Sequence, residues 1–216
     1  MGIVSFIWAS LPVIWEKTVE HTVLVSIAVG LAIIIGVPVG IVITQHKKIA
    51  NAVLYAASVL ITIPSIALFG IMIPLLSPFG YGVGAVPAMI AVLLYSLLPI
   101  IRNTYSAINN IDPALREAAR GLGMRRTERL RMVEIPIALP VILAGVRVAV
   151  VMNIGVMTIA TYIGAGGLGD LINAGIAQTD SNQLIAGALA VSILAVTFDY
   201  ALLLLQKVLT PVGTQG

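Results

Sequence analysis

The sequence predicts an all-α membrane protein with five transmembrane helices, its N-terminus outside and its C-terminus in the cytoplasm. The mean hydropathy is +1.08, and 10% of the 216 residues are charged, against roughly 25% in soluble domains. Long segments lack Asp, Glu, Lys and Arg altogether, notably residues 22–45 and 49–101. Basic residues gather in only some of the connections between these segments. We therefore expect a single transmembrane domain over residues 1–216.

The apolar segments set the number of spans. A helix of about 20 apolar residues crosses a hydrocarbon core of about 30 Å. The charge-free run 49–101 is long enough for two crossings, and the glycine-rich segment 77–84 supplies a turn between them. Two further apolar runs each contain a single charged residue. The predicted spans are 22–44, 52–76, 85–106, 137–162 and 184–206.

The first twenty residues form a separate apolar segment that contains Pro12. A secretory signal begins with a positively charged region. No basic residue precedes this segment, so we do not expect it to be a cleaved signal. Trp8 and Trp15 suit the boundary between membrane and water. We expect an interfacial helix here, with a short additional span as the alternative.

The basic residues predict the orientation. Lys47 and Lys48 lie between spans one and two, six of the twelve basic residues lie between Arg116 and Arg131, and Lys207 follows span five. The connections 77–84 and 163–183 contain no Lys or Arg. Because basic flanking residues favour the cytoplasmic side, segment 111–136 is expected in the cytoplasm.

Segment 111–136 has the pattern of two short helices joined by a bend. Asp112 can cap a helix that starts with Pro113, and Gly121 and Gly123 are suited to end it. A second short helix is expected from Thr127 to just before Pro136. The first helix carries an apolar stripe at helical spacing, made up of Leu115, Ala118, Ala119 and Leu122.

The same segment resembles the permease subunits of binding-protein-dependent ABC importers. Their pattern is Glu-Ala-Ala, three residues, Gly, nine residues, and Ile-x-Leu-Pro. This chain has Glu117-Ala118-Ala119, Gly123 and Pro136 at that spacing, with Val133 and Ile135 in place of Ile and Leu. The alternative is a loop whose arginines merely hold it inside.

The resemblance implies the type I importer fold and a cytoplasmic coupling helix that docks into a groove on a separate ATPase. Glu117 would make polar contact with the ATPase, Ala118 and Ala119 would keep the docking face thin, and Gly123 would allow the bend. Pro136 completes the motif.

The stretches 63–76, 93–124 and 135–172 resemble permeases for osmoprotectants, namely glycine betaine, carnitine and choline. Residues 164–169, GAGGLG, are also similar to permeases for methionine and phosphonate. Two further alternatives remain open: an ion-coupled carrier, which would need intramembrane carboxylates, and a membrane scaffold that transports nothing.

The expected partners follow from the resemblance and from one absent motif. The chain has no G-x-x-x-x-G-K-[ST] phosphate loop, so we expect no enzyme here and ATP and Mg²⁺ on the partner ATPase. The other expected partners are an extracytoplasmic solute-binding protein, a second permease copy or paralogue, and lipid. No nucleic acid, metal site or cofactor of this chain is expected. The expected location is the bacterial cytoplasmic (inner) membrane.

Gly164, Gly166 and Gly169 match the dinucleotide fingerprint G-x-G-x-x-G. That fingerprint needs a preceding strand, and here a membrane span precedes it. Together with Gly167, these glycines instead predict a flexible outer loop that meets the binding protein or lines an outer gate.

Three features inside the spans complete the prediction. Arg147 and Asp199 differ in depth by only about 3 Å and are expected to form a structural ion pair, with snorkelling of Arg147 as the alternative. Pro64, followed by Ser65, is a candidate break that lines the translocation pathway. A small-residue stripe in span one is expected to pack within the chain in preference to a subunit interface; it contains Ala28, Ala32, Gly36 and Gly40.

Overall fold

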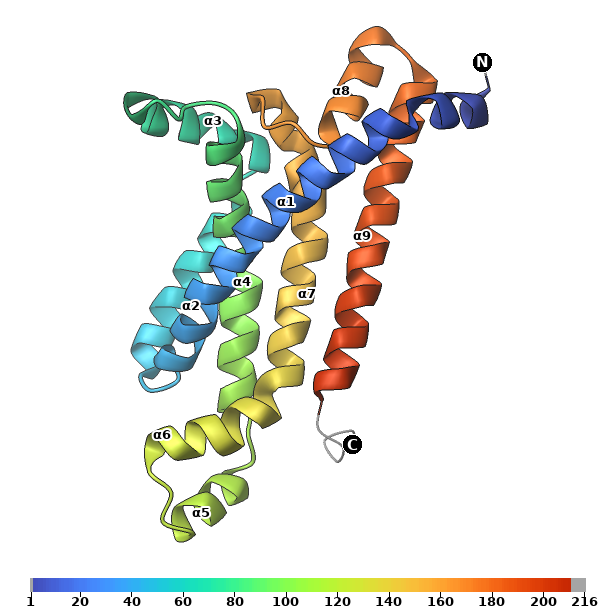
Figure 1. Ribbon diagram of the computed structural model, residues 1–216. Helices are drawn as coiled ribbons and strands as arrows, with labels where there is room; N and C mark the ends of the chain where they lie inside the picture. The colour runs from blue at the N-terminus through green and yellow to red at the C-terminus, as the bar shows by residue number, and fades with distance from the viewer. Residues whose placement is uncertain (1, 211–216) are drawn as a thin grey trace.

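The computed structural model describes residues 2–210, and every regular element in that range is helical (Figure 1). A π-helical segment joins α6 to α7, and 3-10 turns follow α3 and α7. The all-α prediction is confirmed. The helices are α1 (Ile3–Ile43), α2 (Lys47–Thr62), α3 (Ser65–Leu76), α4 (Ala85–Asn109), α5 (Pro113–Gly121), α6 (Arg126–Arg129), α7 (Ile135–Ile159), α8 (Gly169–Gln178) and α9 (Ser181–Leu209).

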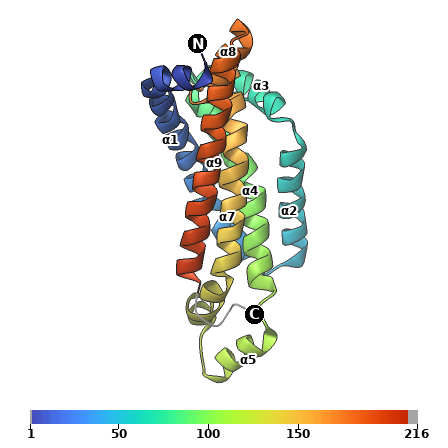
Figure 2. The same ribbon diagram turned by 90° about the vertical axis from the view of Figure 1, so that its right-hand side faces the viewer.

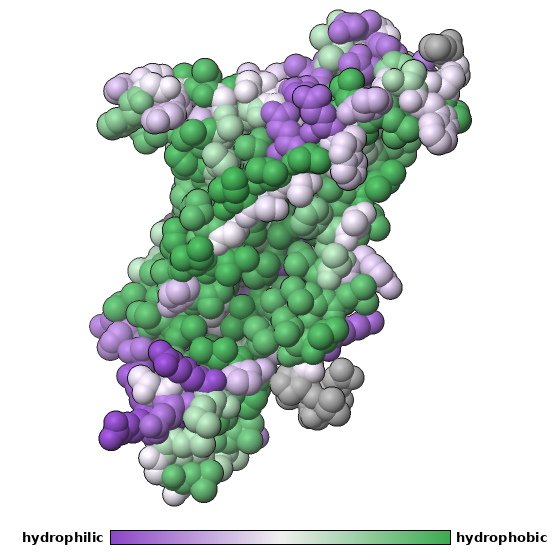
Figure 3. Space-filling view, in the orientation of Figure 1, coloured by the Kyte–Doolittle hydropathy of each residue, from purple (hydrophilic) through white to green (hydrophobic). Residues whose placement is uncertain are grey.

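Four of the described helical stretches are long and apolar enough to cross a membrane, and α2 with α3 makes a fifth when the bent pair is counted as one. Figures 1 and 2 place α5, α6, the α1–α2 turn and the end of α9 at one end of the bundle. The N-terminal turns, α3 and α8 lie at the other end. In Figure 3 a broad apolar band separates polar surfaces at the two ends. This arrangement agrees with the predicted orientation.

The first helix differs from the prediction. Helix α1 runs without interruption for 41 residues, about 60 Å at 1.5 Å per residue. The helix continues through residues 20–22, so the predicted boundary between an interfacial helix in residues 1–20 and a span from residue 22 is wrong; Pro12 is accommodated inside the helix. The first turns still lie across the outer end of the bundle in Figure 1, where an interfacial segment was expected.

Span two is not the straight helix predicted over 52–76. Helices α2 and α3 meet at a bend of 100°. Pro64 has no N–H to donate, and Ile63 before it takes the extended conformation that a following proline favours. The Tyr95 hydroxyl donates to the carbonyl of Ile63, which satisfies a group freed by the break. The predicted break at Pro64 is confirmed, whereas its role in lining a pathway stays a prediction.

Helices α1, α4 and α7 form the core, with α4 in contact with both others. A Cβ on Gly40 would lie 2.6 Å from the Cβ of Thr104, so only glycine allows α1 this close to α4. Gly145 of α7 likewise leaves no room for a Cβ beside Asn103 of α4. The small-residue stripe of α1 is buried throughout, which confirms the prediction that it packs within the chain.

The cytoplasmic helices are connected to the membrane differently from the prediction. The expected second helix, from Thr127 to before Pro136, instead begins at Arg126 and continues through the π-helical segment Leu130–Glu134 into α7. Pro136 lies in the first turn of α7, where a missing N–H is best tolerated. Figure 1 shows α6 lying across the base of α7. We call α5, α6 and the turn between them the cytoplasmic elbow. Helix α6, the π-helical segment and α7 are thus one bent helical unit.

Candidate functional site

The coupling segment folds locally as its sequence predicts. A carboxylate oxygen of Asp112 accepts a hydrogen bond from the N–H of Ala114 at 2.8 Å and caps α5. At the other end Gly123 has φ of +77°, and the N–H of Met124 donates to the carbonyl of Ala119 at 3.2 Å. Such a left-handed residue after the last turn is a common helix end. The predicted start and end of this helix are confirmed.

Two of the predicted docking residues, Glu117 and Ala118, lie on the exposed side of α5, whereas Ala119, expected on the same face, does not. Gly123 is also exposed, whereas Ala119 is buried. Of the apolar stripe, Leu115 and Leu122 are 44% and 78% exposed. An exposed apolar surface with one carboxylate beside it is a surface suited to a protein partner. Pro136, by contrast, is half-buried in α7 and lies away from this exposed face.

A buried ionic joint holds α5 and α6 to the base of α7. The side chain of Glu134 is only 8% exposed, and its Oε1 accepts a hydrogen bond from Nε of Arg129 at 2.9 Å. Nε of Arg116, on α5, lies 3.4 Å from the same oxygen. Arg116 also donates to the carbonyl of Ile108 at the end of α4. One carboxylate thereby links both cytoplasmic helices to the membrane helices.

The sequence reasoning missed Glu134. Its signal was an acidic residue that ends an arginine-rich run and directly precedes an apolar span. The pattern alone did not show which arginines would face it.

The outer glycine loop is packed against α1. The N–H of Gly167 donates to Oε2 of Glu20 at 3.0 Å, and a Cβ on Gly167 would lie 2.9 Å from Nδ1 of His21. A Cβ on Gly166 would meet the Glu20 carboxylate. Lys17 ties the same region to α8 through Asp170, with Nζ 2.7 Å from Oδ2. These contacts tie the loop to α1 and α8, while its flexibility and its role at a gate stay predictions.

The remaining two glycines of the loop differ from each other. Gly164 has φ of +75° and open space where a Cβ would be. Gly169 starts α8, and a Cβ there would lie 2.2 Å from the carbonyl oxygen of Thr158. Among the described residues no group of three or more His, Asp or Glu side chains is arranged to hold a metal ion.

Arg147 of α7 and Asp199 of α9 form the predicted ion pair. Both Nε and Nη2 of Arg147 donate to the carboxylate, the second at 2.6 Å. Two parallel N–H···O bonds are the strong, oriented form of this pair. The prediction that these residues pair is confirmed, and snorkelling of Arg147 away from Asp199 is excluded.

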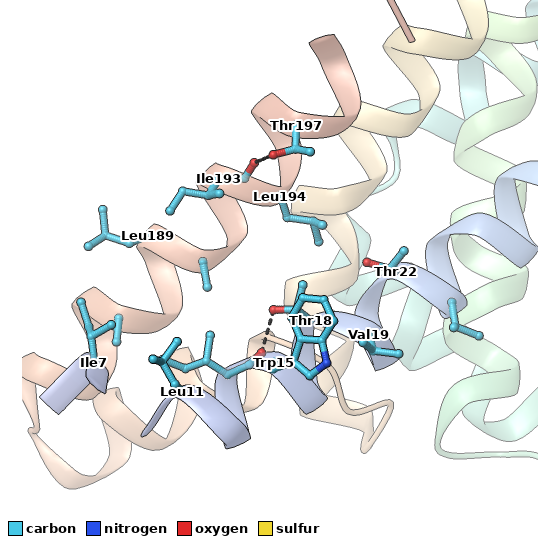
Figure 4. Close-up of a pocket in the computed structure, with 14 residues that line it drawn as sticks. Ile7, Leu11, Trp15, Thr18, Val19, Thr22, Leu189, Ile193, Leu194 and Thr197 are labelled. Carbon is cyan, nitrogen blue, oxygen red and sulfur yellow. Dashed lines mark hydrogen bonds between the residues drawn. The ribbon is translucent and has the colours of Figure 1, made fainter. Parts of the chain in front are cut away.

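One recess near the outer end of the bundle is apolar. About 600 Å³ lies between the first half of α1 and the outer half of α9, with Trp15, Leu11 and Ile193 among the lining residues (Figure 4). The hydroxyls of Thr18 and Thr197 point back to carbonyls of their own helices. The groove therefore offers no group for acid–base chemistry or ion binding.

The fold is a bundle of helices long and apolar enough to cross a membrane, with two short helices at its cytoplasmic end. The chain belongs to the family described as binding-protein-dependent transport system inner membrane component, which it matches over residues 32–212. It is accordingly an inner-membrane protein.

Individual relatives carry more specific names. The chain is 61% identical to the osmoprotectant import permease protein OsmW of Salmonella typhimurium, covering 91% of each chain. It is 44% identical to the glycine betaine/carnitine/choline transport system permease protein OpuCB of Bacillus subtilis, covering 93% of this chain and 90% of the relative.

Solved structures share the fold. The MetNI methionine ABC transporter in an inward-facing conformation matches with a TM-score of 0.82 at 22% identity, over 92% of this chain and 97% of the other. An amino acid ABC transporter solved with histidines matches with a TM-score of 0.78 at 20% identity, over 96% and 98%. The fold is thus that of the membrane subunit in these importers.

Proposed function

We propose that this chain is the permease subunit of an ATP-driven ABC importer for quaternary-amine osmoprotectants such as glycine betaine, carnitine and choline. The observation that carries the coupling role is α5, which presents Glu117 and Ala118 below the membrane while Arg116 of the same helix contacts Glu134 at the base of α7. A push on α5 is thereby delivered to a membrane-crossing helix. The relatives at 61% and 44% identity support the choice of solute.

The proposed assembly contains two permease domains, two ATPase subunits and a solute-binding protein. ATP and Mg²⁺ bind the ATPase subunits, and the binding protein selects the solute outside. Glu117 contacts the ATPase, Ala118 keeps that contact close, and Gly123 sets the bend that follows, whereas Ala119 is buried and packs within the chain. Gly164, Gly166, Gly167 and Gly169 belong to the outer face, towards the binding protein.

The experiment is uptake of labelled glycine betaine into vesicles that contain this chain, the ATPase and the binding protein of its own system. We expect uptake that requires ATP on the ATPase side. Uptake that persists without the ATPase under an ion gradient would support an ion-coupled carrier instead. Uptake of methionine or phosphonate in place of glycine betaine would reject the osmoprotectant assignment but keep the coupling role.

A further inference from the structure

The ion pair of Arg147 and Asp199 leaves part of the guanidinium unused. Asp199 receives hydrogen bonds from Nε and Nη2, and a guanidinium has five N–H groups in a fixed fork. Within residues 2–210, no other hydrogen-bond or ion-pair partner of Arg147 is found. The N–H groups on Nη1 and one on Nη2 are therefore free, and Asp199 holds them in a fixed direction.

This free edge lies deep in the membrane. Arg147 is twelve residues from the start of α7 at Ile135, about 18 Å along the helix. Asp199 is ten residues from the end of α9 at Leu209, about 15 Å from it. The side chains are nevertheless 31% and 36% exposed. A half-exposed ion pair at this depth is costly against lipid, and such groups usually face a cavity or pathway.

Arg147 and Asp199 line a recess on one side of α7. The recess holds about 440 Å³, and its other walls are apolar; they comprise Ala144, Val148, Val151 and Met152. At 100° per residue Ala144 and Val151 lie roughly opposite Ala149 and Asn153, which are buried on the face that packs against the bundle. Arg147 and Asp199 are the only polar residues among those that line the recess.

We propose that the Arg147–Asp199 pair is a contact point for the carboxylate of a zwitterionic quaternary amine as it crosses the membrane. The free N–H groups of Arg147 donate to the solute carboxylate, a pairing that is charge-assisted and suited to the guanidinium fork. The quaternary ammonium donates no hydrogen bond, and it lies against the apolar wall of the recess. The solute carboxylate binds N–H groups of Arg147 that Asp199 does not use, so the ion pair stays intact while the solute is bound.

This inference rests on the proposed function, because that function supplies the solute. It goes further by naming Arg147 as the residue that recognises the solute carboxylate, with Asp199 holding the guanidinium in place. The discriminating solute is choline, which has the same quaternary ammonium as glycine betaine but a hydroxyl in place of the carboxylate. A purely structural ion pair would not distinguish the two solutes.

The test compares uptake of glycine betaine and choline in vesicles with the complete transporter. The double variant R147M/D199L replaces the pair with apolar side chains of similar size, an exchange that buried pairs often tolerate. We expect glycine betaine uptake to fall about tenfold or more, with choline uptake changed about twofold at most. Arg102→Gln removes an arginine near the cytoplasmic end of α4, whose one side-chain contact is with Ser58, and should leave both rates unchanged.

Equal loss or equal retention of both solutes in the double variant overturns the inference. Wild-type vesicles that import neither solute overturn the proposed function and this inference with it. A second measurement tests the inference if the double variant assembles poorly or if the binding protein does not deliver choline. Saturation-transfer NMR on the purified transporter should then give a glycine betaine methyl signal for the wild type and none for Arg147→Lys. This variant keeps the positive charge but loses the forked arrangement of N–H groups. An unchanged signal in the variant also overturns the inference.

Discussion

Oε1 of Glu134 accepts a hydrogen bond from Nε of Arg129 at 2.9 Å, at the point where the cytoplasmic elbow joins the membrane helix α7. Arg116 of α5 reaches the same carboxylate oxygen. Burying a carboxylate costs free energy unless it is paired, so this joint is maintained only while both cytoplasmic helices keep their positions. It provides the rigid connection that a coupling helix needs.

Glu134→Gln should weaken this joint while it keeps the shape of the side chain. A hydrogen bond to a charged group contributes about 1.5–3 kcal/mol, and we expect a loss of stability of that order. The measurement is thermal unfolding of the purified transporter in detergent, together with the number of ATP molecules hydrolysed per solute imported, which should rise. Glu16→Gln, an exposed residue at the outer end, is the control. An unchanged ratio for Glu134→Gln would show that the joint does not transmit motion.

Gly40→Ala should lower the stability of the folded protein and Gly30→Ala should raise it, although both residues lie in α1. A Cβ at residue 40 would lie 2.6 Å from Thr104, whereas nothing lies within 4 Å of a Cβ at residue 30. Overpacking typically costs about 1–3 kcal/mol, and alanine at an open helical position gains up to about 1 kcal/mol over glycine. Unfolding midpoints of the two variants check this. If Gly40→Ala were as stable as Gly30→Ala, the close approach of α1 and α4 would be wrong.

Gly167→Ala should disturb the outer loop and reduce uptake more than Gly164→Ala does. Both residues have positive φ and share the backbone strain of an added Cβ, but only the Cβ at residue 167 would meet His21. The difference between the variants therefore isolates the contact of the outer loop with α1. Proteolysis of the loop and uptake rates in vesicles measure it. Equal behaviour of the two variants would mean that the loop does not depend on that contact.

Asp112→Ala should loosen α5 by about 1 kcal/mol, the usual cost of losing a helix cap. Hydrogen exchange of the amides in residues 114–121 should become faster. Asp180→Ala is the matched control, because Asp180 caps α9 at the opposite end of the protein through the N–H of Asn182 at 2.9 Å. Faster exchange of α5 in the Asp180 variant, or none in the Asp112 variant, would contradict the local role of the cap.

Sequence patterns predicted the features that depend on local chemistry. Asp112 caps a helix and Gly123 ends it because of properties that each residue carries by itself, and Pro64 breaks a helix for the same reason. The pairing of Arg147 with Asp199 could be predicted because charges inside a membrane have few alternatives.

Other features depend on the positions of neighbouring helices and could not be predicted from local sequence patterns. The pattern placed a helix end just before Pro136, yet Pro136 lies inside one continuous helical unit, as Pro12 does inside α1. One proline need not end a helix whose neighbours support it. The 100° bend after α2 and the contact of Gly167 with His21 require the positions of other helices. Glu134 could be identified as a joint only once Arg116 and Arg129 had been placed beside it.

The central claim is that α5 docks onto a separate ATPase. The chain has no cysteine, so Ala118→Cys introduces a unique thiol on the exposed side of α5, and Lys48→Cys places one at the exposed start of α2 as a control. The decisive measurement is the maleimide labelling rate of each thiol in the permease alone and in the complete transporter. We expect residue 118 to be protected about tenfold or more by the ATPase, with residue 48 little changed. Equal labelling of residue 118 in both states would contradict the claim.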